Sequence, residues 1–184
     1  MRTFAVNTSS ALHAVDRGNA VTEPASQDCQ RSELLQSPIF TGLSDEVLES
    51  LIVRGKTLAL KDGDPVLFQD VRGGHGLFVL LSGAIGVYRK SAGSATQKIG
   101  VLKPGDCLGE YSLLDNQPMS ATAGAMEPTR LFFLPKTQFL AVIERDPKAG
   151  CVLYRNLATY LVVRLRMYAE MHPKEAIPGS PEAG

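Results

Sequence analysis

The residues best suited to chemistry lie in one stretch, residues 102–125, which reads LKPGDCLGEYSLLDNQPMSATAGA. Gly109 allows a close approach of the backbone, and the residues after it can begin one helical turn. The free N–H groups of such a turn face one small volume and favour an anion there. The carboxylate of Glu110 beside that volume can accept a hydrogen bond from a hydroxyl group but repels a phosphate. The stretch therefore predicts an anion site in which Glu110 serves a hydroxyl group.

Histidines, which commonly act as catalytic bases or metal ligands, are sparse. Two of the three lie near the chain ends, and the third lies in a Gly-rich stretch, residues 72–76, that is most simply a hairpin loop. A cupin-like metal enzyme would need His and Glu side chains gathered at one place. That class is the disfavoured alternative, and we expect a protein that is not an enzyme. The three histidines are His13, His75 and His172.

The chain has 184 residues, with 19 Lys and Arg against 19 Asp and Glu, so its formal net charge is zero. This balance gives no global attraction to nucleic acid or to an anionic membrane. The longest uninterrupted apolar runs, such as Leu77–Leu81, are far shorter than the roughly 20 residues that span a bilayer. The cysteines (Cys29, Cys107 and Cys151) are far apart and odd in number, which favours reduced thiols in a cytoplasmic protein. Cys107 is expected in the core, with a redox sensor as the alternative.

The middle of the chain is typical of an antiparallel β-sandwich or barrel. Between residues 57 and 135, short apolar segments alternate with turn signals. No helix-length pattern separates them, which argues against a parallel α/β sheet. The segments are TLAL, VLF, LFVLL, AIGVY, KIGVL, SATAGAM and RLFFLP.

Helices are predicted on both sides of this β region. Before it, Ser44 can cap a helix that Gly55 ends. After it, Thr137 can cap a short helix, and Asp146–Pro147 is a typical start for a second helix that continues to near Met171. This last helix carries an apolar stripe at helical spacing. The stripe consists of Leu153, Leu157, Leu161, Leu165 and Tyr168.

The two ends of the chain have a different composition from the middle. Residues 1–30 are rich in polar residues without a sustained apolar period, and we expect a mostly flexible arm there. Residues 172–184 hold three prolines and two glycines and are expected to form a disordered tail. The folded domain is therefore expected to cover residues 31–171.

The stretch 102–125 resembles the phosphate-binding cassette of cyclic nucleotide-binding domains, as found in the catabolite activator and protein kinase A regulatory subunit superfamily. The family pattern is Phe-Gly-Glu, a few apolar or small residues, a loop, and Pro-Arg-Ser/Ala-Ala-Thr. Here it reads Leu108-Gly109-Glu110 and later Pro118-Met119-Ser120-Ala121-Thr122. The similarity extends over residues 34–168, through PIFTGLSDEVLESL, LFVLLSGAIGVYRK, KIGVLKPGD and LYRNLATYLVVRLR.

This resemblance implies a mainly β fold with flanking helices. The expected architecture is an antiparallel eight-stranded, jelly-roll-like β-roll with an N-terminal helical motif and C-terminal helices. It also implies a cyclic nucleotide, cAMP or cGMP, as the candidate ligand. The candidate ligand-binding residues are Leu108, Gly109, Glu110, Tyr111, Ser112, Met119, Ser120, Ala121, Thr122 and Tyr168.

The resemblance gives several of these residues a role. Glu110 matches the glutamate that accepts the ribose 2′-hydroxyl, and a solvated loop carboxylate is its plain alternative. The backbone amides of Gly109, Tyr111 and Ser112 match those that cap the cyclic phosphate. Ser120 and Thr122 match small hydroxyl positions at the phosphate and the purine, and simple β-propensity on a strand is their alternative.

One departure from the family pattern has the largest consequence. The arginine that clamps the cyclic phosphate falls at Met119. Arginine offers a bidentate, charged fork, whereas methionine offers an uncharged thioether. Since a charged hydrogen bond is worth roughly 1.5–3 kcal/mol, losing two weakens binding by about 100-fold or much more. Lys103 and Arg130 are the candidate substitutes if the fold brings them close.

We therefore interpret the chain as a non-enzymatic, bacterial-type regulatory domain with weak or no cAMP binding. It would act through a protein partner of unknown identity or through its own dimer. A dimer would form through the helix 148–171, on the side with Leu153, Leu157, Tyr160 and Leu161, and packing of that side on the β-roll is the alternative. The alternative function is a genuine sensor of cAMP, cGMP or a cyclic dinucleotide.

DNA binding is not expected. In catabolite activator relatives a helix-turn-helix follows the last helix, and here 13 Pro-rich residues follow it. The family's last helix also swings over the nucleotide, and Tyr168 falls near the position that covers the base. Its ring can stack on a purine or fill an empty pocket; we favour the second, with the helix resting closed. The arginines of this helix (Arg155, Arg164 and Arg166) are expected to form a solvated basic face.

Overall fold

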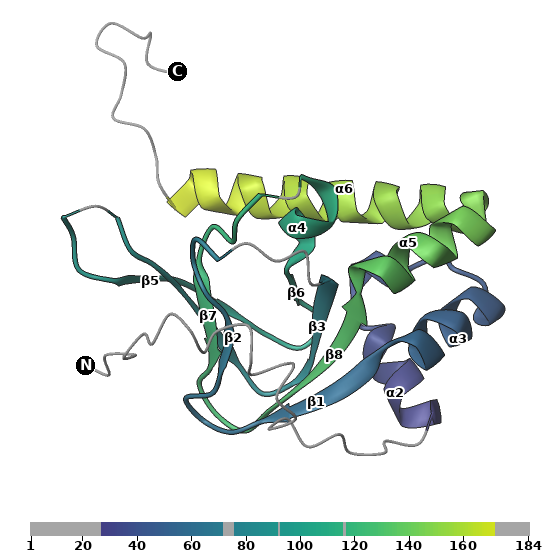
Figure 1. Ribbon diagram of the computed structural model, residues 1–184, viewed down its shortest axis with the longest axis horizontal. Coiled ribbons are helices and arrows are strands. Elements are labelled where there is room, and N and C mark those ends of the chain that lie inside the picture. The colour runs from purple at the N-terminus through teal and green to yellow at the C-terminus, as the bar shows by residue number, and fades with distance from the viewer. Residues whose placement is uncertain (1–26, 72–75, 92, 116, 172–184) are drawn as a thin grey trace, which may run out of the picture.

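The computed structural model describes residues 27–71, 76–91, 93–115 and 117–171. Helices lie at one end of a β-roll, and one long helix runs across it (Figure 1). Most of the predicted arm, the predicted tail and all three histidines lie outside the described residues, and α2 begins inside the span predicted as arm. The elements are α2 (Gln27–Leu34), η1 (Pro38–Phe40), α3 (Asp45–Arg54), β1 (Lys56–Leu60), β2 (Pro65–Leu67), β3 (Gly76–Ser82), β4 (Ile85–Arg89), β5 (Gln97–Leu102), β6 (Cys107–Leu108), α4 (Glu110–Leu114), β7 (Thr122–Ala125), β8 (Thr129–Pro135), α5 (Lys136–Arg145) and α6 (Pro147–Met171).

The strands form two four-stranded sheets. Their orders are β1-β8-β3-β6 and β2-β7-β4-β5, and every pairing among them is antiparallel. This confirms the predicted antiparallel eight-stranded β-roll with flanking helices. Each of the seven apolar segments named from the sequence overlaps one of these strands, and only the two-residue strand β6 lay outside them.

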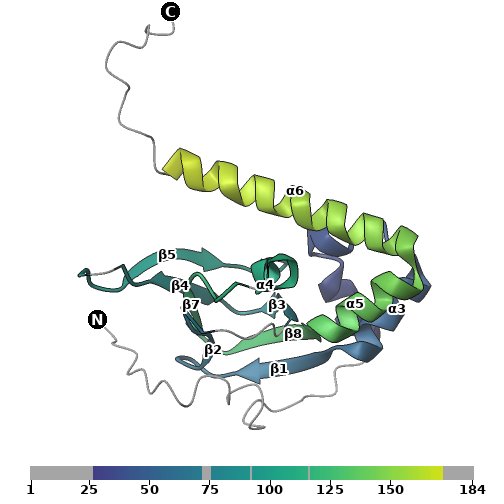
Figure 2. The ribbon, with the colours of Figure 1, turned by 45° about the horizontal axis from the view of Figure 1, so that its top comes forward.

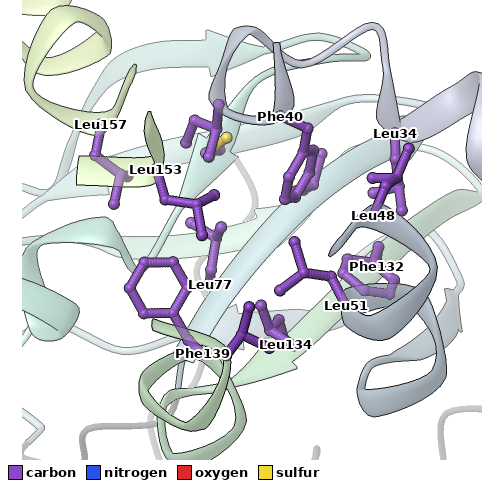
Figure 3. Close-up of a cluster of buried hydrophobic side chains, with 14 of the residues drawn as sticks. Leu34, Phe40, Leu48, Leu51, Leu77, Phe132, Leu134, Phe139, Leu153 and Leu157 are labelled. Atoms are coloured by element: carbon purple, nitrogen blue, oxygen red, sulfur yellow. The ribbon is translucent and has the colours of Figure 1, made fainter. Parts of the chain in front are cut away.

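The first sheet is buried on both faces, which explains the uninterrupted apolar run in β3. Leu77, Val79 and Leu81 point into a core shared with the helices, as Figure 3 shows for Leu77. Phe78 and Leu80 point into a second core between the two sheets. Side chains alternate along a strand, so a strand with a core on each face needs apolar residues at every position.

The helix starts follow local capping chemistry, with one exception. Ser44 caps α3 by accepting a hydrogen bond from the Val47 N–H, and Asp146 accepts from two N–H groups in the first turn of α6, as predicted. The predicted cap at Thr137 is wrong, because α5 already begins at Lys136. Pro135 at the end of β8 has a φ of −57°, and the chain passes from the strand directly into the helix.

Helix α6 crosses the roll above α4 and extends beyond it (Figures 1 and 2). The predicted stripe on it divides in two. Leu153 and Leu157 are fully buried beside Phe139 and Leu77 (Figure 3), whereas Leu165 is 67% exposed. Steps of four residues overshoot the 3.6-residue turn, so the row rotates away from the core. The core-facing row consists of Leu153, Leu157, Tyr160 and Arg164.

Candidate functional site

The residues of the predicted anion site lie at the end of β6. Gly109 adopts φ +81° and serves as the N-cap of α4, so the helical turn begins where the sequence predicts it. A Cβ at this position would lie 2.5 Å from the Gly76 carbonyl oxygen. Both the left-handed backbone and this close approach require glycine. Leu108 before it is buried against β3, and Tyr111 after it is about half exposed.

Glu110 is buried, with 4% of its surface exposed, so the alternative of a solvated loop carboxylate is wrong. Burial raises the pKa of its carboxyl group, while its own backbone N–H and the positive charge of Arg164 oppose that rise. A buried carboxyl group beside an arginine can accept a hydrogen bond from a ligand hydroxyl. The ribose-binding role that the cassette pattern gives Glu110 stays a prediction.

The second half of the cassette leads into β7, so the segment as a whole passes from one sheet to the other. Met119 is 7% exposed, and its backbone exchanges hydrogen bonds with Asp70 and Val71. Thr122 begins β7, and its hydroxyl accepts a hydrogen bond of 3.1 Å from the Gln69 N–H. Ser120 is exposed and Ala121 is half-buried in the loop before β7, while Ser112 lies within α4.

Two residues of α6 that the sequence did not assign to this site, Tyr160 and Arg164, also contact it. The Tyr160 hydroxyl accepts a 2.9 Å hydrogen bond from the Cys107 N–H and donates one of 3.2 Å to the Cys107 carbonyl. Arg164 donates to the same carbonyl at 3.2 Å and to the Tyr160 hydroxyl at 3.0 Å. The expected solvated basic face is therefore wrong for Arg164. Its helical spacing from Leu153 and Leu157 is the signal that marks it as core-facing.

Cys107 is buried, as predicted, and its sulfur lies 3.3 Å from the Ser37 hydroxyl oxygen. Burial raises the pKa of its thiol to about 12. A thiol with that pKa is protonated at neutral pH, whereas oxidation proceeds through the thiolate. The redox-sensor alternative for Cys107 therefore has no chemical support here.

The remaining candidates lie in other environments. Tyr168 is 48% exposed, so its ring does not fill an empty pocket as favoured from the sequence. Arg130 forms a 2.6 Å ion pair with Glu33 of α2, and Lys103 is exposed in the turn before β6. Neither cation is shown in contact with Met119. Arg164 is the cation that the described residues place beside Glu110.

Gly109 and Glu110 thus begin a short helix of a β-roll that the long helix α6 crosses, which agrees with the resemblance to cyclic nucleotide-binding domains. Residues 57–146 match the family described as cyclic nucleotide-binding domain. The cyclic AMP receptor protein of Thermus thermophilus is 34% identical over 130 residues, which are 71% of this chain and 58% of that protein. This chain therefore carries a cyclic nucleotide-binding domain of the catabolite activator superfamily.

Solved structures agree with this assignment. The Thermus thermophilus catabolite activator protein shares 33% identity with a TM-score of 0.63, covering 73% of this chain and 61% of that chain. A cyclic nucleotide-binding domain from Methylobacillus flagellatus shares the fold, with 24% identity, a TM-score of 0.74, and coverage of 82% and 88%. The chain thus spans about three fifths of its Thermus relatives.

Two further observations concern the described residues alone. None of their helices is both long enough and apolar enough to cross a bilayer. No three His, Cys, Asp or Glu side chains among them gather closely enough to hold a metal ion.

Proposed function

We propose that this chain is a non-enzymatic regulatory domain that binds cAMP weakly or not at all and acts through a protein partner or its own dimer. The observation that carries the proposal is Met119, a buried and uncharged side chain at the position of the family's phosphate-clamping arginine. Glu110 adds to the argument. When ionised, its buried carboxylate repels a cyclic phosphate, and Arg164 is shared between this carboxylate and the contacts to Tyr160 and Cys107.

Genuine cyclic nucleotide sensing is the second candidate. The Thermus thermophilus relative is named a cyclic AMP receptor protein, and the Gly109 N-cap that would present backbone amides to a phosphate is intact. In this case the amides would hold the phosphate without an arginine. The affinity decides between the two candidates.

Isothermal titration of the purified chain with cAMP, cGMP and cyclic di-GMP tests the proposal. We expect a cAMP dissociation constant above about 100 µM, which corresponds to a binding free energy weaker than about −5.5 kcal/mol. A submicromolar constant for any of the three nucleotides would support the sensor and contradict the proposal.

The dimer that we propose uses a different face of α6 from the one first expected. Leu153, Leu157 and Tyr160 are buried within the chain and cannot pair with a second copy. A separate row at positions 154, 158, 161, 165 and 168 alternates spacings of four and three residues, the pattern of a coiled-coil seam. Tyr154, Leu165 and Tyr168 of this row are exposed.

Analytical ultracentrifugation tests this dimer. We expect the unmodified chain to sediment as a dimer at micromolar concentration and Leu165→Glu to sediment as a monomer. Val163→Glu, an equally charged change at an exposed position outside the row, is the control and should leave the dimer intact. If the unmodified chain is still a monomer at about 100 µM, pairing through α6 is contradicted. The free energy of dimerisation would then be weaker than about −5.5 kcal/mol.

A further inference from the structure

Strand β6 lies at the outer edge of its sheet and leads directly into the cassette. It pairs with β3 on one side, where the Asp106 carbonyl accepts a 2.9 Å hydrogen bond from the Leu80 N–H. Backbone groups alternate sides along a strand, so the N–H and carbonyl of the next residue, Cys107, face away from β3. A buried pair of backbone groups at a sheet edge needs partners.

Tyr160 of α6 supplies both partners with a single atom. Its hydroxyl oxygen accepts from the Cys107 N–H at 2.9 Å and donates to the Cys107 carbonyl at 3.2 Å. The hydroxyl thus forms hydrogen bonds with both backbone groups of Cys107, as a neighbouring strand would. Burial raises the pKa of Tyr160, which keeps the hydroxyl protonated and able to donate at neutral pH.

Arg164, one helical turn further along α6, supports this contact. It donates to the Cys107 carbonyl and to the Tyr160 hydroxyl, and its guanidinium lies 5.6 Å from the centre of the Tyr160 ring. Its positive charge also acts on Glu110, three residues after Cys107. Helix α6 and the first half of the cassette are therefore joined by one connected set of polar contacts.

We propose that Tyr160 is a latch: its hydroxyl binds α6 to the open edge of β6, and Arg164 stabilises this contact. Protein groups alone therefore keep the helix packed against β6. The two-residue strand β6 transmits the position of α6 to Gly109 and Glu110, because Cys107 and Leu108 directly precede them in the chain. Releasing the latch frees the outer half of α6 and the β6 edge, while the two cores remain packed.

Hydrogen exchange of the full chain, resolved by residue and measured without any nucleotide, tests this proposal. Tyr160→Phe keeps the ring and removes only the hydroxyl, which leaves two buried backbone groups without a partner. We expect the Cys107 amide and the amides of residues 161–170 to exchange about tenfold faster, with Leu77–Leu81 unchanged. Arg164→Gln should give a smaller acceleration at the same places.

Thr159→Val is the matched control, because it removes a hydroxyl from the same helix at an exposed position outside the proposed dimer row, where that hydroxyl donates to the Arg155 carbonyl of the helix itself. It should leave exchange unchanged at Cys107 and in residues 161–170. Unchanged exchange at Cys107 in Tyr160→Phe would overturn the latch. So would a uniform acceleration that includes Leu77–Leu81, since Tyr160 would then only stabilise the fold. If Tyr160→Phe does not fold, Arg164→Gln decides by the same criterion. The test uses no ligand, so its failure leaves the proposed affinity untouched.

Discussion

Replacing Met119 by arginine tests the reason we give for weak cAMP binding. Two backbone hydrogen bonds to Asp70 and Val71 hold this position, so the new side chain would start from a fixed point in the cassette. In the absence of nucleotide, a guanidinium would occupy a place where only 7% of the present side chain is exposed. Burying a charge without a full set of partners destabilises a fold. A cyclic phosphate would supply those partners.

Met119→Arg should therefore strengthen cAMP binding and lower the stability of the nucleotide-free fold. A charged hydrogen bond contributes about 1.5–3 kcal/mol, and part of the bidentate gain is spent on desolvating the guanidinium. Taking the net gain as one such bond, Met119→Arg should strengthen cAMP binding by about 10- to 150-fold. The same variant should unfold at a lower urea concentration than the unmodified chain when no nucleotide is present.

Isothermal titration and urea unfolding, each with and without cAMP, measure both effects. Met119→Leu is the control, because it keeps an apolar side chain of similar size, costs less than about 1.5 kcal/mol and offers no charge. It should leave cAMP affinity unchanged. An arginine variant that folds but gains no affinity would refute the argument that the missing cation limits binding.

Three further predictions concern the cassette and the charge of the chain. Gly109→Ala should destabilise the fold by about 2 kcal/mol or more in urea unfolding, because left-handed backbone costs about 1–2 kcal/mol and the new Cβ meets the Gly76 carbonyl. Gly42→Ala is the control: its φ is +78° and its surroundings are open, so it should show the backbone cost alone. Because burial raises the pKa of Glu110 above its ordinary 4.5, the folded state holds this proton more tightly, and stability should fall as pH rises above that value. Glu110→Gln should reduce this loss, and an unchanged pH profile of urea unfolding would count against the burial argument. With zero net charge, the 184-residue chain should not bind duplex DNA at nanomolar concentration; salt-sensitive retention of a duplex in a filter-binding assay would contradict this.

The cassette was predictable from the sequence because its geometry depends on residue types with few substitutes. Gly109 must be glycine where φ is +81° and a carbonyl oxygen lies against it, so the residue itself marks the turn. The strands were predictable for a related reason, since a sheet buried on both faces produces the unbroken apolar run of β3. In both cases the residue types and the hydrophobic pattern were sufficient to predict the local structure.

The contribution of α6 could not be predicted in the same way. The spacing of Arg164 from Leu157 marks it as facing the core, but only the packing of the helix against the roll decides that its partner is Cys107. The Tyr160 contact joins residues 53 positions apart in the chain. Such a pairing depends on how the helix packs against the sheet edge, and the spacing of residues within either segment carries no record of it.

We expect that cAMP, which the domain binds weakly or not at all, does not move helix α6, because a ligand shifts a conformational equilibrium only by its differential affinity for the two states. Hydrogen exchange of residues 153–171, with and without millimolar cAMP, tests this claim most directly. We predict the same exchange rates in both conditions. Strong additional protection of α6 in the presence of cAMP would contradict the account and show a working cyclic nucleotide switch.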